Sequence, residues 1–403
     1  MTKVVLVTHF DPLPIGHGGN HRSYQMLYDL ENLPGSLQVI KIITPIYANL
    51  ILNKKQRVLW KIITALIRTA QRIFGFFLYF FYCGNIPRVL TQIRPLEKQG
   101  YRLKFASKLE EYKESILRGE KPVACIIDHP SFECFIDINK KYGIPTILCG
   151  HNLESFDGFI YDRWSYEEGM SASIRFSDEY KFLSRCDHRL MISVIEKNIL
   201  DGLGLYTGYY PYFPVGKISE RLQALREKRH ANPQEPGLLL LLGSYYHLST
   251  AEGMTWLTRE LTRLGNPKFP LHLIVAGNGT SLLKDKFHLP DWIEVKGWIE
   301  QDVLDDLFVR TQGVLIPQRL GFGAVTRLSE LACAGIPMVV SEFSTRAFER
   351  PPGTYIAGDR IEDWIPNIEC LAAGKLTGAT SSDYSVWESK LTNGLTSIIK
   401  EYL

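Results

Sequence analysis

The sequence predicts an α/β protein with two doubly wound domains, each built on a parallel sheet that helices cover on both faces. Three observations predict this class. Short apolar runs alternate with longer helical patterns along the chain. The runs are continuously apolar rather than alternating, which is typical of strands buried on both faces. The length of 403 residues, with 45% hydrophobic and 22% charged residues, indicates a globular protein of two domains with large cores.

Ten apolar runs are predicted strands, five in each half of the chain. Those of the first half are Val4–Thr8, Leu37–Ile43, Ala124–Ile127, Thr146–Leu148 and Arg189–Ser193. Those of the second half are Leu238–Leu242, Leu271–Ala276, Ile293–Val295, Gly313–Ile316 and Met338–Val340. In doubly wound folds ligands bind at the carboxyl ends of the strands, so we expect both domains to face a common cleft from these ends.

These runs define the expected domain organisation. We expect an N-terminal domain over 1–215, a linker over 216–236, a C-terminal domain over 237–382 and a final helix over 383–403. The charged residues and prolines of Lys217–Pro236 indicate an exposed helix followed by a link. The apolar residues of the last segment recur at helical spacing, which predicts an amphipathic helix covering one of the domains.

Composition restricts the class of protein further. The net charge of +3 is close to neutral and gives no case for nucleic acid as the main partner. The seven cysteines are scattered and form no Cys-x-x-Cys pair, so they indicate reduced thiols in a cytoplasmic protein. The chain begins directly with a strand pattern, and no window reaches 18 uninterrupted apolar residues. We therefore expect neither a signal peptide nor a transmembrane helix.

The stretch with the most information about function follows the predicted strand Gly313–Ile316. Gly321 and Gly323 form a glycine turn, and the helix-like run after it carries Arg327 and Glu330, three positions apart and so on one face. A strand, a glycine turn and a helix start leave backbone N–H groups for an anion. A cation beside a carboxylate suits a phosphorylated sugar, since the cation binds phosphate and the carboxylate binds hydroxyls. This pattern predicts a nucleotide-sugar site.

These residues, with others in the same order, resemble the GT-B glycosyltransferases, specifically retaining enzymes like glycosyltransferase family 4. The resemblance covers nearly the whole chain. It implies two Rossmann-like domains, of which the second binds a nucleotide diphosphate sugar and the first supplies most of the acceptor site. The matching segments are Val4–Thr8 with the glycine-rich Pro14–Asn20, Cys186–Ser193, Gly243–Ser244, Ala276–Gly279, Gly297–Trp298 and Pro317–Pro337.

The sequence departs from the family pattern in two places. Family members typically carry a Glu-x7-Glu pair; Glu330 fits the second glutamate, but Phe322 stands at the first. The chain resembles a subset with a "proline–x–arginine–x–glycine–x–glycine" run, in which the usual lysine corresponds to Arg327. The Arg/Lys pair that many members place after the strand ending at Gly243 is missing. That leaves Arg319 and Arg327 as the expected diphosphate cations.

The resemblance implies roles for the residues of the second domain. Glu330 would hold the ribose hydroxyls of the donor, with a solvated helix glutamate as the alternative. Arg327 and Arg319 would stabilise the leaving diphosphate, with a surface ion pair as the alternative. The remaining expected donor-site residues of this domain are Gly243, Asn278, Gly321, Phe322 and Gly323, with His247 as a further candidate.

The first domain offers two further clusters. Gly18 and Gly19 would let backbone N–H groups approach the donor, or they form a plain turn. Asn20, His21 and Arg22, at the start of the following helix, are candidates for acceptor or phosphate contacts.

His151 follows a predicted strand end, where by resemblance a histidine contacts the donor sugar or acts at the reacting centre; the alternative is a capping residue. Glu154 could orient His151 or bind acceptor, and Asp128-His129 is expected to be mainly structural.

The segment 57–83 carries basic and aromatic residues at helical spacing, followed by an apolar run too short to span a bilayer. It indicates either a helix on the cytoplasmic face of a membrane or a core or interface helix. The acceptor is accordingly expected to be a saccharide or a lipid-linked glycan.

The resulting function prediction is a retaining glycosyltransferase that uses a nucleotide diphosphate sugar as donor and needs no cofactor. We expect no metal, because the sequence has no Asp-x-Asp motif. The alternatives are a GT-B sugar-nucleotide epimerase or phosphorylase, or a degenerate GT-B scaffold, which Phe322 and the missing Arg/Lys pair motivate.

Overall fold

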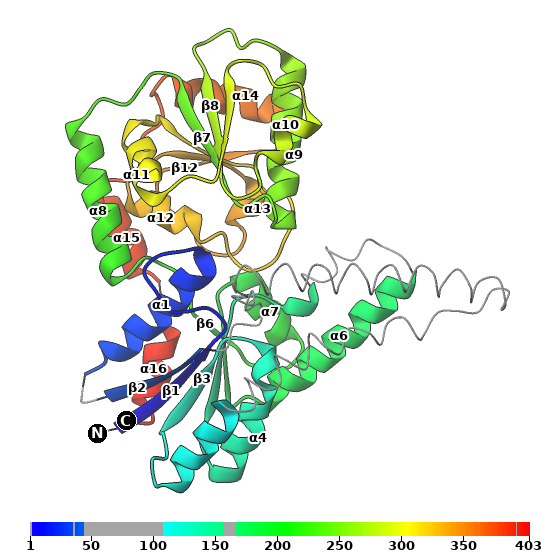
Figure 1. Cartoon of the computed structure of the whole chain (residues 1–403), viewed down its shortest axis with the longest axis vertical. Coiled ribbons are helices and arrows are strands. Elements are labelled where there is room, and N and C mark those ends of the chain that lie inside the picture. The colour runs from blue at the N-terminus through cyan, green and yellow to red at the C-terminus, as the bar shows by residue number, and fades with distance from the viewer. Residues whose placement is uncertain (1, 35–36, 44–107, 157–165, 392) are drawn as a thin grey trace, which may run out of the picture. The chain divides into compact units, whose positions relative to one another are not determined.

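The computed structural model describes residues 2–34, 37–43, 108–156, 166–391 and 393–403. The chain folds as two compact units, one of Met1–Lys41 with Pro122–Leu403 and one of Ile42–Lys121. The larger unit contains two parallel α/β sheets and all the functional candidates with a described position (Figure 1). The segment 57–83 lies outside the described residues. None of the described helices combines the length and apolarity that crossing a bilayer needs.

The first sheet has six strands in the order β2-β1-β3-β4-β5-β6. Every pair from β1 to β6 is parallel, with Val4 opposite Ala124 and Ile147 opposite His188. The strands are β1 (Thr2–Thr8), β2 (Leu37–Ile43), β3 (Ala124–Ile127), β4 (Thr146–Gly150), β5 (His188–Met191) and β6 (Gly208–Tyr209).

The second sheet also has six strands, in the order β12-β11-β10-β7-β8-β9, and all its pairs are parallel. The two strands that the sequence did not predict, β6 and β12, are edge strands. The strands are β7 (Leu238–Leu242), β8 (His272–Ala276), β9 (Ile293–Gly297), β10 (Gly313–Ile316), β11 (Met338–Ser341) and β12 (Thr354–Ala357).

Helices connect the strands of both sheets, as parallel strands require. In the first half they are α1 (Gly18–Glu31), the 3₁₀ turn η2 (Pro130–Phe132), α4 (Glu133–Tyr142), α6 (Tyr166–Arg185) and α7 (Val194–Gly202). In the second half they are α8 (Gly216–Ala231), α9 (Leu248–Leu264), α10 (Leu282–Lys286), α11 (Gln301–Arg310), α12 (Arg327–Cys333), α13 (Glu342–Thr345), α14 (Ile361–Ala372), α15 (Ser381–Ser389) and α16 (Gly394–Lys400).

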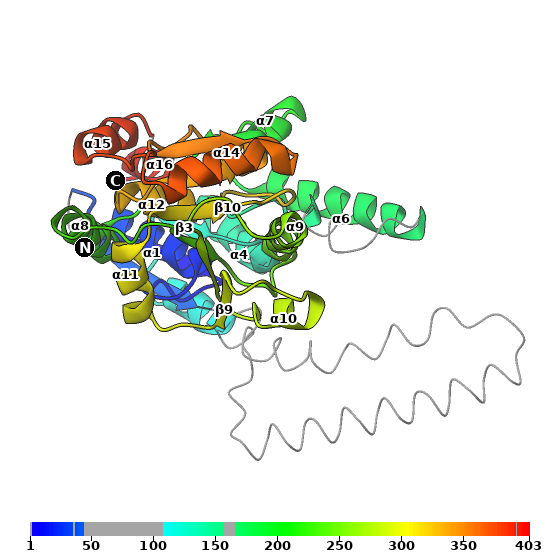
Figure 2. The ribbon, with the colours of Figure 1, turned by 90° about the horizontal axis from the view of Figure 1, so that it is seen from above.

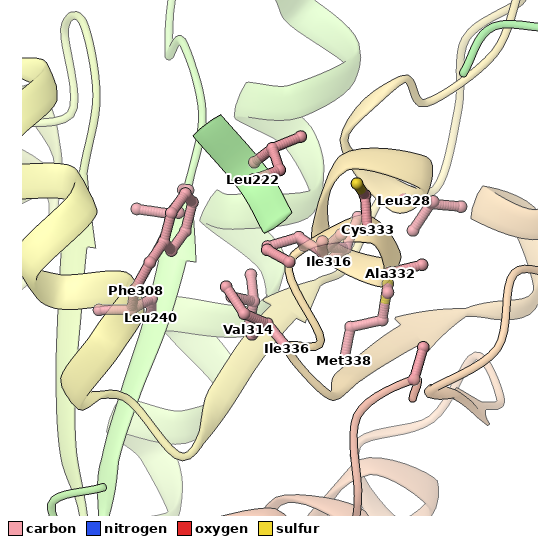
Figure 3. Close-up of a cluster of buried hydrophobic side chains, with 14 of the residues drawn as sticks. Leu222, Leu240, Phe308, Val314, Ile316, Leu328, Ala332, Cys333, Ile336 and Met338 are labelled. Carbon is pink, nitrogen blue, oxygen red and sulfur yellow. The ribbon is translucent and has the colours of Figure 1, made fainter. Parts of the chain in front are cut away.

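The five leucines of β7 show how the second sheet is covered. Successive side chains of a strand point to opposite faces. Leu238, Leu240 and Leu242 pack with residues of α8, α11, α12 and α15 in one buried cluster. Figure 3 shows part of it, with Leu240 labelled together with Leu222 of α8 and Phe308 of α11. Leu239 and Leu241 pack with residues of α9, α10 and α14 in another. Figures 1 and 2 both show α8 beside α11 on one side of this sheet and α9 on the other. A continuous apolar run is therefore required here, because water reaches neither face.

The expectation of an exposed helix at the start of the linker is wrong, because one face of α8 is buried. Ile218, Leu222 and Leu225 are 1%, 1% and 3% exposed and lie in the core of the second sheet. Arg226 and Arg229 are also buried, and their guanidinium groups donate to carbonyl oxygens of the second domain. The sequence prediction weighed the many charged residues of this helix and missed its apolar stripe, which has the i, i+4, i+7 spacing of a helix packed on one face.

The C-terminal segment forms two helices rather than one. Asn393 accepts a hydrogen bond from the Thr396 N–H at 3.1 Å and so starts α16 as a new helix. Trp387 of α15 packs in the core of the second sheet, whereas Leu395 and Ile399 of α16 pack in the core of the first. The segment therefore covers both sheets, where the sequence predicted that it covers one.

Candidate functional site

The glycine-rich loop between β10 and α12 brings residues of the two sheets together. Gly321 and Gly323 have φ angles of 118° and 71°, which favour glycine. A Cβ atom on Gly323 would lie 2.7 Å from the carbonyl oxygen of His151, the residue that follows β4. The Gly323 N–H donates to Glu196 at 2.9 Å, and the Leu153 N–H donates to the same oxygen at 3.1 Å. Thus two predicted site residues distant in sequence, His151 and Gly323, are neighbours.

Glu330 lies on α12, and its carboxylate meets two side chains from outside the second sheet. His21 Nδ1 lies 2.7 Å from Glu330 Oε1, and the Tyr212 hydroxyl donates to the same oxygen at 2.9 Å. Burial opposes ionisation of Glu330, but the nearby His21 and the hydrogen bonds of His21 and Tyr212 outweigh it and lower the pKa of the carboxyl group. Glu330 is thus an ionised acceptor at neutral pH, as a site for sugar hydroxyls requires.

Arg327 begins α12 and lies at the carboxyl end of β7. Its Nη1 donates to the carbonyl oxygen of Leu242, the last residue of that strand. A Cβ atom on Gly243 would lie 3.2 Å from Arg327 Nη1, so this glycine gives the guanidinium its place. Burial lowers the pKa of Arg327, and the carboxylate of Glu330 opposes that change. The other guanidinium nitrogens have no hydrogen-bond partner among the described residues, which leaves them for an anion.

The start of α9 is a site element of which the sequence indicated only His247, the residue directly before this helix. This helix has 17 residues, and its first-turn N–H groups have no partners within the helix. Ser249 in that turn is 1% exposed, and its hydroxyl has no hydrogen-bond partner among the described residues. A Cβ atom on Gly321 would lie 2.6 Å from the Ser249 hydroxyl. The α9 start therefore lies against the glycine-rich loop, whereas α12, with seven residues, is short.

Three predicted donor-site residues have other contacts. The Arg319 guanidinium stacks 4.4 Å from the ring centre of Trp256 on α9. The ring of Phe322 lies 5.1 Å from that of Phe156 and 5.5 Å from the guanidinium of Arg346. Asn278 is exposed and accepts the Tyr245 N–H through its backbone carbonyl at 2.7 Å. None of these contacts joins them to Glu330 or Arg327, so their predicted roles stay predictions.

The glycines at the start of α1 serve close packing. A Cβ atom on Gly18 would lie 2.5 Å from the hydroxyl oxygen of Thr326, the residue before α12, and one on Gly19 would overlap the ring of Phe10. Asn20 takes part in the capping box of α1, with its oxygen 3.3 Å from the His17 nitrogen. The start of α1 thus meets the start of α12.

Arg22, a candidate for acceptor or phosphate, is fully buried instead. Its guanidinium donates to the carbonyl oxygens of Tyr210 at 2.5 Å and Pro211 at 3.2 Å, and lies 3.9 Å from the Tyr210 ring centre. The expectation of a ligand contact is wrong, because these protein groups enclose the guanidinium at 0% exposure.

A second polar cluster lies at the carboxyl ends of β1, β3 and β4. Asp128 accepts the His9 N–H with both oxygens, at 2.9 and 3.0 Å, and lies 3.3 Å from His151 Nε2. Glu154 lies 3.5 Å from His129 Nε2, so its ion-pair partner is His129 rather than His151. Burial, with His129 and His151 contributing, lowers the pKa of His9 to about 4 although Asp128 opposes it. Asp128, expected to be mainly structural, is therefore the carboxylate that contacts the His151 imidazole, where the sequence suggested Glu154.

We predict that Asp128→Asn lowers kcat at least about tenfold with unchanged affinity for the nucleoside diphosphate, because an amide has a single accepting oxygen and cannot hold both the His9 N–H and the His151 imidazole as the carboxylate does. Steady-state kinetics and calorimetry measure the two effects. Asp187→Asn is the matched control: Asp187 accepts the Thr146 N–H at 2.7 Å, at the amino end of β4. Equal kcat losses in both variants would show that Asp128 only supports the sheet.

Metal binding would need several suitable side chains in one place. No group of three or more His, Cys, Asp or Glu that could hold a metal occurs in the part of the chain that the structure describes. The ionised and cationic groups of the site, Glu330 and Arg327, are those that bind hydroxyls and phosphate.

Comparison with known proteins gives likeness at the level of structure. No protein-family model matches the sequence, and no curated protein matches it significantly. A sucrose-phosphate synthase from Thermosynechococcus elongatus is similar over 100% of this chain and 98% of its own, with a TM-score of 0.63 and 13% identity. The Anabaena protein HepE in complex with UDP is similar over 100% and 99%, with a TM-score of 0.56 and 12% identity.

A third solved structure, the trehalose 6-phosphate synthase from Burkholderia multivorans, covers 100% of this chain and 98% of its own, with a TM-score of 0.51 and 12% identity. At these identities the likeness establishes the fold. The two parallel six-stranded sheets with their covering helices match those of all three. The chain therefore has the GT-B fold with two Rossmann-like domains, as the sequence predicts.

Proposed function

We propose that this protein is a glycosyltransferase that moves a sugar from a nucleoside diphosphate sugar to a saccharide or lipid-linked acceptor, with retention of configuration and without a metal. The observation that carries the proposal is the pair of Glu330 and Arg327 on α12, with Arg327 bound to the carboxyl end of β7 in a sheet of Rossmann type. The order of motifs along the chain favours an enzyme like those of glycosyltransferase family 4.

In the proposed donor site, Glu330, Arg327 and the start of α9 bind different parts of the nucleotide. Glu330 accepts hydrogen bonds from the ribose hydroxyls. Arg327 and the first-turn N–H groups of α9 bind the diphosphate, with Ser249 as a further donor. The α9 start thus supplies the anion-binding groups that the missing Arg/Lys pair would give.

The proposed reaction uses these groups as follows. The bond between the anomeric carbon and the diphosphate oxygen breaks, and the diphosphate keeps the electron pair. An acceptor hydroxyl forms the new bond on the face of the sugar from which the diphosphate departs, which gives retention. Its proton passes to the departing diphosphate oxygen. Arg327 stabilises the negative charge that develops there. His151, held by Asp128, lies beside Gly323 and would hydrogen-bond the transferred sugar.

A thermal-shift screen against UDP, GDP and ADP and their sugars tests the proposal. A ligand that binds the native state raises the melting temperature. UDP compounds come first, because HepE has been solved with UDP and with UDP-glucose. We expect at least one nucleotide to raise the melting temperature at millimolar concentration. No shift with any of them would overturn the proposal, and turnover of donor without acceptor would favour an epimerase instead.

We also predict that EDTA leaves activity unchanged, because the charge on the leaving diphosphate is met by Arg327 and helix N–H groups. Initial rates with and without a chelator, after dialysis to remove free cations, measure this. Loss of activity that Mg²⁺ or Mn²⁺ restores would contradict metal independence while leaving the donor site as proposed.

A further inference from the structure

One oxygen of Glu330 receives both of the hydrogen bonds that reach this carboxylate from described residues. His21 Nδ1 lies 2.7 Å and the Tyr212 hydroxyl 2.9 Å from Oε1. The side chains of His21 and Glu330 are 9% and 16% exposed, and Tyr212 is 1% exposed. The short contact with Glu330 makes Nδ1 the proton-bearing nitrogen of His21, since a carboxylate only accepts. The second oxygen, Oε2, accepts no hydrogen bond from the described part of the chain.

The two residues that donate to Glu330 belong to segments that are hydrogen-bonded to each other. His21 lies on α1, and Tyr212 lies in the segment between β6 and α8. Arg22 and Gln25 of α1 both donate to the Pro211 carbonyl oxygen, at 3.2 and 3.1 Å. The hydroxyl of Tyr210 in the same segment donates to Asp29 of α1 at 2.5 Å.

These hydrogen bonds hold His21 and Tyr212 in fixed positions relative to each other. Arg22, Gln25 and Tyr210 are each 0% exposed, so the polar contacts between α1 and the 210–212 segment are sheltered from water. His21 and Tyr212 consequently approach Glu330 from one rigid assembly and do not depend on α12 for their own positions.

We propose that His21 and Tyr212 are positioning residues that orient Glu330 for the nucleotide: they occupy Oε1 and present Oε2 to the ribose. This inference rests on the proposed function, because it assigns Oε2 to the donor. Since α1 packs on the first sheet and α12 on the second, donor affinity then depends on residues of the acceptor half.

The test uses three variants of the full chain and calorimetry with the nucleoside diphosphate that gives the largest thermal shift. His21→Ala removes one of the two bonds to a buried carboxylate, and we expect the affinity to fall about tenfold. Tyr212→Phe should lower it by a similar factor. His21→Asn keeps an N–H donor near the place of Nδ1, so we expect it to restore affinity to within about threefold of the wild type.

Two comparisons separate positioning from general support of the fold. In a Glu330→Gln background, His21→Ala should cause little further loss, because residues that act through one another are not additive. In kinetics the donor KM should rise while kcat changes little. His188→Ala is the matched control, since His188 Nε2 also contacts a side chain distant in sequence, the Tyr402 hydroxyl at 2.6 Å. We expect wild-type affinity for this control.

The outcomes of this test are distinct from those of the proposed function. If the wild type binds no nucleoside diphosphate, the proposed function fails. If the wild type binds one and both His21→Ala and Tyr212→Phe bind it equally well, only the positioning role is overturned. A His21→Asn protein that keeps the wild-type melting temperature yet binds the nucleotide as weakly as His21→Ala would also overturn the positioning role. So would a further fall in affinity of about tenfold when His21→Ala is added to Glu330→Gln.

Discussion

Glu330→Ala should weaken nucleotide binding about 100-fold, or about 2.7 kcal/mol, while the fold stays intact. The loss comes from the hydrogen bonds between a carboxylate and the ribose hydroxyls, which exceed those of neutral pairs in strength. Although burial opposes ionisation, His21 and the hydrogen bonds of His21 and Tyr212 lower the pKa of Glu330, so the wild type offers an ionised acceptor at neutral pH. Calorimetry with the nucleoside diphosphate measures the effect, and circular dichroism checks the fold.

Glu260→Gln is the control for this prediction. The Glu260 side chain has the same 16% exposure as that of Glu330, but it pairs with Arg259 and Arg263 near the end of α9. It should bind nucleotide as the wild type does. Wild-type affinity and turnover in Glu330→Ala would refute the assignment of the donor site.

Arg327→Ala should lower kcat by a factor of about 100 to 1,000, the usual cost of removing one group that stabilises developing negative charge. Arg327 is the one predicted diphosphate cation that the structure places next to Glu330, at the end of β7 and beside Gly243. Arg327→Lys should recover part of the rate, because an ammonium keeps the charge but not the planar set of donors. Rates at saturating donor and acceptor measure both variants.

Arg229→Lys separates catalysis from stability. Arg229 is 8% exposed and donates to the carbonyl oxygen of Thr311 at 2.9 Å, before the amino end of β10. Its replacement should lower the melting temperature and leave kcat unchanged. If Arg327→Ala and Arg229→Lys lower the melting temperature equally and neither lowers kcat, Arg327 is a structural arginine.

The sequence allowed the fold to be predicted because most strands are continuous apolar runs. β7 consists of five leucines, each buried on one face or the other, and its predicted bounds match the structure. β12 was not predicted, because Ile356 is 39% exposed and the strand lies at an edge of the sheet, where apolar and polar residues are mixed. β6 has two residues and carries no periodicity at all.

The residues of the candidate site could be proposed from the sequence where their pattern is local. Arg327 and Glu330 are three residues apart, and their spacing to Gly323 is visible in the sequence. The pairing of His21 with Glu330 joins residues 309 positions apart, and no short pattern encodes it. Asp128 and His151 were both placed at strand ends, but only the packing of β3 against β4 shows that they meet.

The division of the C-terminal segment has a consequence for how the protein is made. Leu395 and Ile399 of α16 are fully buried in the core of the first sheet, together with Leu30 of α1. A ribosome therefore completes β6, the last strand of the first sheet, at Tyr209, and Leu395 of the same core follows only 186 residues later. During translation that half exposes an unfinished apolar face, and we expect chaperones that hold nascent chains to be needed until α16 docks.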